Sequence, residues 1–306
     1  MKALIIGAGN IAIQYNFFDK NIDTHYKAMK ALNFEIDIFE LDTEKIQFLK
    51  TNILDIKIVE EINWKKYDFV SICSSTNSHF KYLKLCIEHK IPIILCEKPI
   101  CENLNELIEL KNIIENNSSK IYINYVRRYL KHFSIAKNYI NNDEIIFGEI
   151  KYQRGFLNNA SHAFDLLQFF LGNIQINNIK NVVIGNEEIK NDKNLSFNCN
   201  IDNIEFDIKA LNNVNYNYFE LILYGKNSLI KILHAGNEIE IYEIEKNKSV
   251  YKSNLIIKEK FSSTLENYML EVYQQIITAQ KSNAMESILL NLQLIEIKNK
   301  YAKLSN

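Results

Sequence analysis

A short apolar strand that runs directly into a glycine-rich turn opens the chain and limits the folds available to it. Residues 2–6 are mostly apolar, and the sequence GAGNIA follows at residues 7–12. An apolar run that ends in glycines and leads to a helical pattern is typical of a buried parallel strand that feeds a helix. We therefore expect the chain to begin with a strand–turn–helix unit of an α/β fold.

Strands and helices then alternate as far as residue 125. Further strands are expected at residues 35–39, 69–73, 91–96 and 121–125, with helices at 43–50, 80–89 and 103–116. This alternation is typical of a doubly wound parallel sheet. Residues 1–125 are therefore predicted to form an N-terminal Rossmann domain.

The pattern changes after this point. Helices are expected at residues 130–140 and 162–171, strands at 146–154 and repeatedly over 179–257, and helical periodicity again over 263–303. Turns that contain Asn and Gly separate the later strands, which favours antiparallel hairpins. Residues 126–306 are therefore predicted to form a C-terminal α+β domain with a largely antiparallel sheet.

Charge and composition exclude several kinds of partner. Lys and Arg total 36 against 37 Asp and Glu, so the chain lacks the basic excess expected of a protein that binds nucleic acid. No apolar run approaches the ~20 residues needed to cross a bilayer, and the first run breaks too early for a signal peptide. We therefore expect a cytoplasmic protein with neither a nucleic-acid nor a membrane partner.

The cysteines and histidines do not form a metal-binding pattern. The five cysteines include no CxxC pair, and the six histidines are not clustered with them at short spacing. Without a secretion signal, free and mostly buried thiols are expected. No metal site is predicted.

The glycine turn has the pattern of a dinucleotide-binding site. Gly7 permits a tight turn, Gly9 lets the backbone approach a pyrophosphate, and the small Ala12 lets the helix pack on the strand. The start of the helix, with Asn10 and Ile11, then faces the phosphate charge. The position between a strand and a helix is the context that supports this motif.

Glu40, at the end of the second strand, indicates which dinucleotide binds. A carboxylate there accepts hydrogen bonds from a ribose 2′-hydroxyl and repels a 2′-phosphate, so NAD is expected rather than NADP. Asp42 is the alternative acidic residue, although its position favours a helix cap.

Residues 14–23 lengthen the spacing between the glycines and Glu40. This polar and aromatic insertion interrupts the helix directly after the phosphate turn. We expect it to form a loop over the cofactor or the cleft, with Tyr15, Phe17 and Phe18 buried.

Two further motifs follow the third and fourth strands. They are Ser74-Ser75-Thr76-Asn77-Ser78-His79 and Cys96-Glu97-Lys98-Pro99. Together with the glycine turn, the acidic strand end and the Arg127-Arg128 pair, they resemble the Gfo/Idh/MocA family of oxidoreductases. The resemblance is strong through residue 128 and weaker beyond it.

The resemblance implies roles for residues of the N-terminal half. Lys98 matches the family's catalytic lysine, which can donate a hydrogen bond to a sugar hydroxyl or carbonyl, and relatives often have a cis bond before the following proline. The residues expected to bind the cofactor are Gly7, Gly9, Asn10, Ile11, Ala12, Glu40, Ser74, Thr76, Asn77, His79, Glu97 and Lys98.

In the C-terminal half, His162 matches the family's catalytic or substrate-binding histidine. The family usually has an Asp four residues before it, but this chain has Asn158, so a proton relay would lack one member. A helix-capping histidine is the alternative interpretation.

The arginines are few and grouped. The chain has only Arg127, Arg128 and Arg154, and arginine binds carboxylates or phosphates bidentately where lysine does not. Arg128 and Arg154, with Tyr125, Asn158 and His162, are expected to bind substrate. Structural ion pairs together with codon bias are the alternative explanation.

The function predicted from this resemblance is an NAD-dependent oxidoreductase. It would transfer a hydride between nicotinamide and a sugar or nucleotide-sugar hydroxyl or carbonyl, as in surface-polysaccharide biosynthesis, and act as a homodimer or homotetramer. A non-catalytic NAD-binding regulator on the same fold is the main alternative. A reductase of imines or pyrroles, such as the biliverdin-reductase type, is a third, which the intact Glu97-Lys98-Pro99 motif disfavours.

Overall fold

The computed structural model describes residues 1–245, 253–279 and 281–301, and the chain divides into two compact units. The first unit contains Met1–Tyr129 and Glu266–Leu292, and the second contains Leu130–Leu265 and the chain from Gln293 onward. The C-terminal segment returns to the first unit because its apolar side chains are buried in the core of that unit. A single boundary after residue 125 does not describe this return.

The first unit is built on a six-stranded parallel sheet with the order β3-β2-β1-β4-β5-β6. Its strands are β1 (Lys2–Ile6), β2 (Glu35–Phe39), β3 (Lys57–Ile58), β4 (Phe69–Ile72), β5 (Ile93–Cys96) and β6 (Lys120–Ile123). The central strands β1 and β4 are mostly apolar and buried along nearly their whole length because both faces of the sheet are covered. The order reverses between β1 and β4, which is where open α/β sheets bind their ligands.

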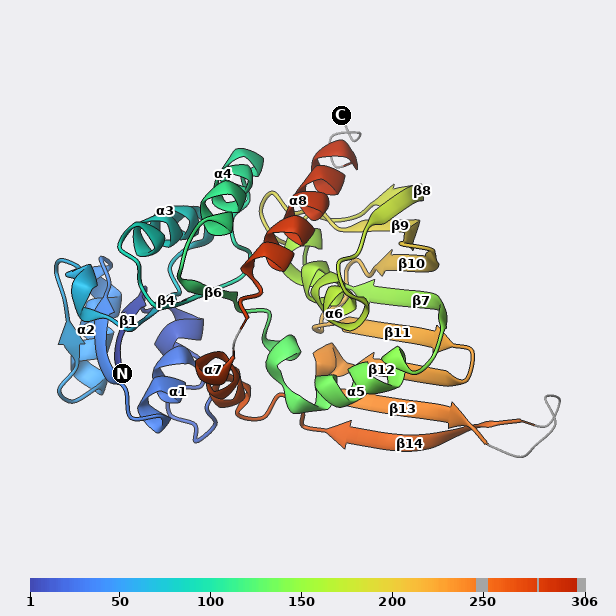
Figure 1. Ribbon diagram of the computed structural model, residues 1–306, viewed down its shortest axis with the longest axis horizontal. Coiled ribbons are helices and arrows are strands. Elements are labelled where there is room, and N and C mark those ends of the chain that lie inside the picture. The colour runs from blue at the N-terminus through green and yellow to red at the C-terminus, as the bar shows by residue number, and fades with distance from the viewer. Residues whose placement is uncertain (246–252, 280, 302–306) are drawn as a thin grey trace. The chain divides into compact units, whose positions relative to one another are not determined.

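Helices cover both faces of this sheet. They are α1 (His25–Ala31), α2 (Thr43–Asn52), α3 (Thr76–Glu88), α4 (Leu104–Glu115), α7 (Tyr268–Thr278) and the first part of α8 (Ala284–Tyr301), with short helical turns η1 (Asn10–Gln14), η2 (Trp64–Lys66) and η3 (Val126–Tyr129). Figure 1 shows α3 and α4 on one face and α1 and α7 on the other. Thr24, Asp42 and Asn103 cap α1, α2 and α4 by accepting backbone hydrogen bonds.

The second unit is built on an eight-stranded sheet with the order β14-β13-β12-β11-β7-β10-β9-β8. Its strands are β7 (Ile145–Tyr152), β8 (Ile176–Ile184), β9 (Leu195–Ile201), β10 (Ile204–Ala210), β11 (Phe219–Gly225), β12 (Ser228–Leu233), β13 (Glu238–Ile244) and β14 (Leu255–Ser262). All neighbouring pairs are antiparallel except β7 with β10. The two predicted sheet types are therefore confirmed.

Helices cover one face of the second sheet. They are α5 (Lys131–Asn141) and α6 (Ser161–Leu171), which continues the turn η4 (Phe156–Ala160), while η5 (His234–Gly236) joins β12 to β13. Leu221, Leu223, Ile230 and Ile232 alternate along β11 and β12 and are fully buried, as expected for one covered face. The intervening residues of these strands are partly exposed on the opposite face.

The end of the described chain is helical, as the periodicity over residues 263–303 predicts. Two helices, α7 and α8, lie within that range. Residues 280, 302 and 303 of this prediction, and residues 246–252 of the predicted strand region, lie outside the described residues. No helix among those that the structure describes is long and apolar enough to cross a membrane.

The prediction that all three aromatic residues of the insertion are buried is wrong. Tyr15 is 51% exposed and Phe18 is 85% exposed, while Phe17 packs edge-on against Phe48. Lys27 Nζ donates to the backbone carbonyls of Asn16, Asp19 and Asn21, and the Ile22 amide donates to Asn267 Oδ1. Hydrogen bonds of its backbone therefore hold the loop while two of its rings stay exposed.

Candidate functional site

The glycine turn after β1 brings two strand ends into close contact. Gly7 has φ +94°, and a Cβ there would lie 2.8 Å from the Ser74 backbone that follows β4. Gly9 is the opposite case, since a Cβ there would have no atom within 4 Å. The first glycine is therefore required by the fold, and the second leaves open space where a phosphate can approach the backbone.

The other predicted residues of this turn have different environments. Asn10 is exposed, Ile11 is half-buried against the core, and Ala12 is fully buried. They lie in the π-helical turn η1, and α1 begins only at His25, after the insertion. The helix that was expected to face the phosphate is therefore a single turn here.

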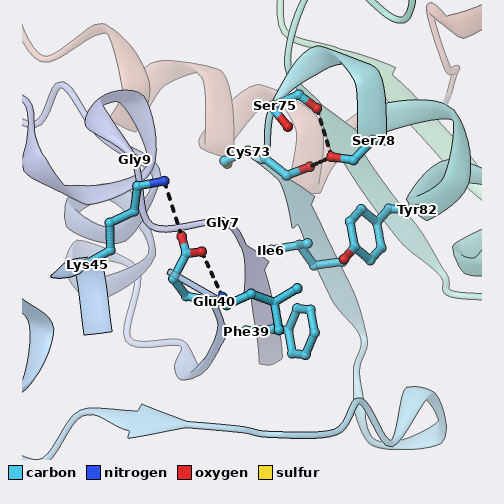
Figure 2. A pocket seen from close by; sticks show the side chains of 12 residues that line it. Ile6, Gly7, Gly9, Phe39, Glu40, Lys45, Cys73, Ser75, Ser78 and Tyr82 are labelled. Carbon is cyan, nitrogen blue, oxygen red and sulfur yellow. Dashed lines mark hydrogen bonds and ion pairs between the residues drawn. The ribbon is translucent and has the colours of Figure 1, made fainter. Parts of the chain in front are cut away.

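A cleft of about 440 Å³ opens beside the glycine turn, at the carboxyl ends of β1, β2 and β4 (Figure 2). Its lining residues are Ile6, Gly7, Gly9, Phe39, Glu40, Leu41, Lys45, Cys73, Ser74, Ser75, Ser78 and Tyr82. No residue of the 14–23 insertion is among them. The cleft combines exposed backbone at the glycines with one carboxylate and several hydroxyls, which suits the ribose and phosphate groups of a dinucleotide.

Glu40 links the end of β2 to the glycine turn. Its Oε2 accepts a hydrogen bond from the Ala8 amide at 2.7 Å, and its Oε1 accepts from the amides of Leu41 and Asp42. Figure 2 shows Lys45 directed toward it, with Nζ 3.7 Å from Oε2. Asp42 caps α2 as predicted, whereas Lys45 was not recognised from the sequence because nothing in the chain marks which residue of α2 faces the cleft.

The loop after β4 reaches the same cleft through its serines. Ser74, Ser75 and Ser78 line the cleft, while Thr76 and Asn77 lie in the first turn of α3 and are not among its lining residues. Ser75 Oγ donates to Asn77 Oδ1 at 2.6 Å.

His79 is buried and joins two loops of the site. Its Nδ1 lies 2.9 Å from the Pro99 carbonyl, and its Nε2 lies 2.9 Å from the Ser74 carbonyl. The ring therefore couples the loop after β4 to the turn after β5. In this structure His79 supports the cofactor side of the site without lining the cleft.

The Glu97-Lys98-Pro99 turn follows β5, and the Lys98–Pro99 bond is cis as predicted. Glu97 is mostly buried, and its Oε1 accepts hydrogen bonds from His25 Nε2 at 2.8 Å and from Asn124 Nδ2 at 2.5 Å. Burial acts to raise the pKa of Glu97, but the hydrogen bonds of His25 and Asn124 and the charge of Lys98 outweigh it, so this pKa is lowered. Glu97 is therefore held as a carboxylate beside Lys98.

Behind Glu97 lies a buried hydrogen-bonded cluster that sequence reasoning missed. His25 Nδ1 lies 2.8 Å from the Tyr273 hydroxyl, and that hydroxyl lies 2.6 Å from Ser71 Oγ. His25 and Tyr273 are 248 residues apart in the sequence. The Thr24-His25 pair at the end of the insertion was a visible signal, but nothing in the sequence indicated that α7 would supply a partner.

Two predicted substrate residues of the first unit are buried and bonded to α8. The Tyr125 hydroxyl accepts from Asn291 Nδ2 at 3.3 Å, and Arg128 Nη1 donates to Glu286 Oε2 at 3.0 Å. The Arg128 side chain is 5% exposed. The ion-pair interpretation of this arginine therefore has a direct structural basis.

Arg154 lies in the second unit, just after β7, in the left-handed region at φ +65°. It is exposed, and its Nη1 donates to Asn217 Oδ1 at 2.6 Å. It borders a hollow of about 370 Å³ lined by Gln153, Arg154, Glu188, Ile189, Val214, Asn215, Tyr216 and Asn217.

His162 is half-buried in the first turn of α6, which continues directly from η4. The Asn158 side chain donates to the Arg154 carbonyl at 3.0 Å, and the Asn158 backbone amide donates to Asp192 Oδ2 at 2.8 Å. Asp192, a buried carboxylate missed from the sequence, also accepts from Leu157 N and so caps this helical segment. Lys98 belongs to the first unit and His162 to the second, and their convergence on one substrate remains a prediction.

Comparison with known proteins agrees with this geometry. Residues 1–125 match the family GFO_IDH_MocA, described as "Oxidoreductase family, NAD-binding Rossmann fold". Residues 1–125 are thus similar to the NAD-binding domain of this oxidoreductase family. The resemblance inferred from the motifs and the NAD prediction are thus confirmed for this part of the chain.

A curated relative matches part of this chain. The uncharacterized oxidoreductase YrbE of Bacillus subtilis (strain 168) is 28% identical over 104 residues, which are 34% of this chain. The match spans only 29% of the length of YrbE.

Solved structures match the fold along nearly the whole chain. The dehydrogenase MviM from Clostridium difficile has a TM-score of 0.74 at 16% identity and covers 98% of this chain and 99% of its own. UDP-N-acetylglucosamine 3-dehydrogenase GnnA from Acidithiobacillus ferrooxidans has a TM-score of 0.73 at 12% identity, and the match covers 98% of this chain and 96% of GnnA. A super-repressor mutant of Gal80p from Saccharomyces cerevisiae has a TM-score of 0.72 at 13% identity, and the match covers 100% of this chain and 97% of the Gal80p chain. At these identities the likeness establishes the two-unit fold.

Proposed function

We propose that this protein is an NAD-dependent oxidoreductase that transfers a hydride between nicotinamide and a sugar or nucleotide-sugar hydroxyl or carbonyl. The observation that carries the proposal is the placement of the glycine turn, Glu40 and the Glu97-Lys98 turn at the carboxyl edge of one parallel sheet. A structural neighbour named as a UDP-N-acetylglucosamine dehydrogenase supports the substrate class. Five buried free thiols agree with a cytoplasmic setting.

The residues divide the work between binding and proton handling. The Gly7–Gly9 turn and the serines of the cleft would hold the phosphates of NAD, and Glu40 would hold its adenosine ribose. When bound, NAD supplies the hydride acceptor or donor. Lys98 donates a hydrogen bond to the substrate oxygen and transfers the proton of the reacting hydroxyl. His162 binds a second hydroxyl or relays that proton. The carboxylate of Glu97 keeps a negative charge beside Lys98.

The mass of the molecules released on denaturation tests this proposal. Protein purified without added nucleotide is unfolded, and the released small molecules are identified by mass spectrometry. NAD or NADH together with a sugar or nucleotide-sugar is the expected result, and the sugar found then becomes the substrate for turnover assays. A protein that neither releases nor binds NAD(H) would refute the proposal.

A non-catalytic NAD-binding regulator is the second candidate. Asn158 supports it, since this side chain carries no charge and donates to the Arg154 carbonyl. A neighbouring structure is that of a super-repressor mutant of Gal80p. Tight NADH binding without turnover of any sugar or nucleotide-sugar would favour this candidate over the enzyme.

Preference for NAD over NADP is expected to depend on Glu40. In a Glu40→Ser variant, the ratio of the NADP to the NAD dissociation constant should fall about tenfold, because one negative charge beside the 2′-phosphate is removed. Lys45 Nζ, 3.7 Å from Glu40 Oε2, then becomes available to the phosphate. Fluorescence titration with NADH and NADPH measures both constants.

Asp42→Ser is the matched control for this prediction. It removes the same charge nearby, and serine caps a helix about as well as aspartate, so α2 should keep its cap. The control should leave the cofactor ratio nearly unchanged. Equal dissociation constants for NAD and NADP in the unmutated protein would contradict the role of Glu40.

The uncovered face of the second sheet is proposed to form a homodimer or homotetramer. This face combines apolar and charged side chains, among them Glu149, Lys151, Ile222, Tyr224, Leu229, Lys231 and Tyr242. On such a surface, apolar side chains can pack against those of a second copy, and opposite charges of the two copies can pair. Light scattering at micromolar concentration should give a dimer or tetramer, and Ile222→Asp should lower the mass. Leu54→Asp, at an exposed residue of the first unit, should not. A monomeric unmutated protein would count against the interface.

A further inference from the structure

A chain of buried hydrogen bonds ends at the Glu97 carboxylate. Ser71, His25 and Tyr273 are each 0% exposed and come from β4, α1 and α7, which surround this point of the first unit. The chain runs from Ser71 Oγ to the Tyr273 hydroxyl, then to His25 Nδ1, and from His25 Nε2 to Glu97 Oε1. Three elements far apart in the sequence therefore converge on one carboxylate oxygen.

The order of the protons in this chain follows from its acceptors. An ionised Glu97 can only accept, so His25 Nε2 carries a proton. The Tyr273 hydroxyl then donates to Nδ1 and accepts from Ser71 Oγ. In the reverse order, the Tyr273 hydroxyl donates to Ser71 Oγ and the Ser71 hydroxyl donates to Nδ1 over the longer distance of 3.3 Å, so Nδ1 accepts in both orders. The network thus specifies one tautomer of His25.

This cluster also determines where Glu97 points. Glu97 Oε1 accepts hydrogen bonds from both His25 and Asn124, and neither of these contacts uses Oε2. The Glu97 side chain is 12% exposed. The Glu97 amide donates to the Ile72 carbonyl, and the Pro99 carbonyl is bonded by His79. Hydrogen bonds therefore hold both ends of the turn that carries Lys98, and His25 holds the Glu97 side chain of that turn.

We propose that His25 is a positioning residue of the nucleotide site, which holds Glu97 as a carboxylate and fixes the turn that carries Lys98, and that Tyr273 in turn fixes His25. The inference rests on the proposed function, together with the expectation from the sequence that Glu97 binds the cofactor. It extends that function to the 14–23 insertion and α7, because the insertion ends at the residues that present His25 and α7 supplies Tyr273.

The inference gives a definite dependence on pH. Removing the imidazole leaves the burial of Glu97 opposed only by Asn124 and Lys98, so its pKa should rise. The titratable groups that face Glu97 from the packed elements are His25, Cys73, Cys96, Lys98, Tyr268 and Tyr273. Burial raises the pKa of the Cys73, Cys96, Tyr268 and Tyr273 side chains, so these stay neutral near pH 7. A dependence of the affinity on pH that arises when His25 is replaced is therefore assigned to the Glu97 carboxyl.

The test is the dissociation constant of NADH as a function of pH in the full chain. In the unmutated protein the affinity should stay level from neutral pH down to below the usual range of glutamate. In His25→Phe, the affinity should fall at acidic pH with a midpoint at least about one pH unit higher, about tenfold at a fixed acidic pH. It should recover as the pH rises and the carboxylate forms again.

Three further variants sharpen the result. His25→Gln keeps an amide donor for Glu97 and should restore most of the midpoint. Tyr273→Phe keeps the ring stacked on Phe69 and should give a smaller shift in the same direction, since Ser71 Oγ lies 3.3 Å from Nδ1. His89→Phe, at an exposed histidine stacked on Trp64, is the matched control and should change nothing.

A purely structural role for His25 would weaken binding equally at all pH values, or leave it unchanged, and either result would overturn the inference. If His25→Phe does not fold, Tyr273→Phe decides by the same criterion. Should the unmutated protein not bind NADH, the proposed function fails, and carbon NMR of the Glu97 carboxyl still decides the inference. A carboxyl titration that is the same in the unmutated protein and in Tyr273→Phe would then refute it.

Discussion

Replacement of Lys98 by alanine is expected to lower kcat about 10²–10⁴-fold, the usual effect of removing an acid–base group. NADH affinity should be nearly unchanged, because the cleft that holds the nucleotide is formed by the glycine turn, Glu40 and the loop after β4. Lys98 follows β5 directly, in a turn whose Glu97 side chain is fixed by His25 and Asn124. The loss should therefore be in the chemical step.

Steady-state kinetics with the sugar identified by mass spectrometry measures this effect. Lys66→Ala, at an exposed lysine of η2 in the same unit, is the control and should keep full activity. His162→Ala should act more mildly, because His162 is assigned a binding or relay role. A Lys98→Ala enzyme with undiminished turnover would overturn the mechanism.

The first sheet could be predicted well because its signals are local. β1, β4 and β5 are mostly apolar, and each ends in a motif that an α/β fold places at the edge where ligands bind. The carboxyl ends of parallel strands lie at one edge of the sheet, so Gly7, Glu40 and Ser74 could be expected around one cleft. The structure places all three there.

The remaining parts of the site depend on contacts that are distant in the sequence. The return of α7 to the first unit, and with it the Tyr273–His25 bond, joins residues 248 positions apart. Asp192 reaches the start of η4 in the same way, across 34 positions to Asn158. Periodicity shows that α7 has an apolar face, but it does not show which core receives that face.

The prediction that the aromatic residues of the 14–23 insertion are buried was wrong for a different reason. The aromatic residues of the insertion indicated burial, since large rings are usually packed. Its backbone carbonyls, however, are bonded by Lys27, a residue of α1 that looks like an ordinary surface lysine in the sequence. Composition alone could not reveal that hydrogen bonds from Lys27 would help to hold the loop.

Gly7→Ala is expected to destabilise the protein by about 2–4 kcal/mol, because it combines backbone strain with a clash. The residue has φ +94°, where an L side chain is strained, and the new Cβ would lie 2.8 Å from Ser74 Cα and N. Both neighbouring atoms are backbone at the end of β4, so no side chain can move aside. The turn or the β1–β4 contact would have to shift, and with it the wall of the cleft.

Gly9→Ala separates the effect on the fold from the effect on the nucleotide. Gly9 has φ −75°, and its Cβ would meet nothing within 4 Å, so the unfolding midpoint in denaturant should barely change. NADH affinity should nevertheless fall, because the methyl group occupies the space over which a pyrophosphate approaches the backbone. Gly7→Ala should lower both quantities. Equal stability loss in the two variants would show that the turn is not strained as described, and unchanged NADH affinity in Gly9→Ala would place the phosphates elsewhere.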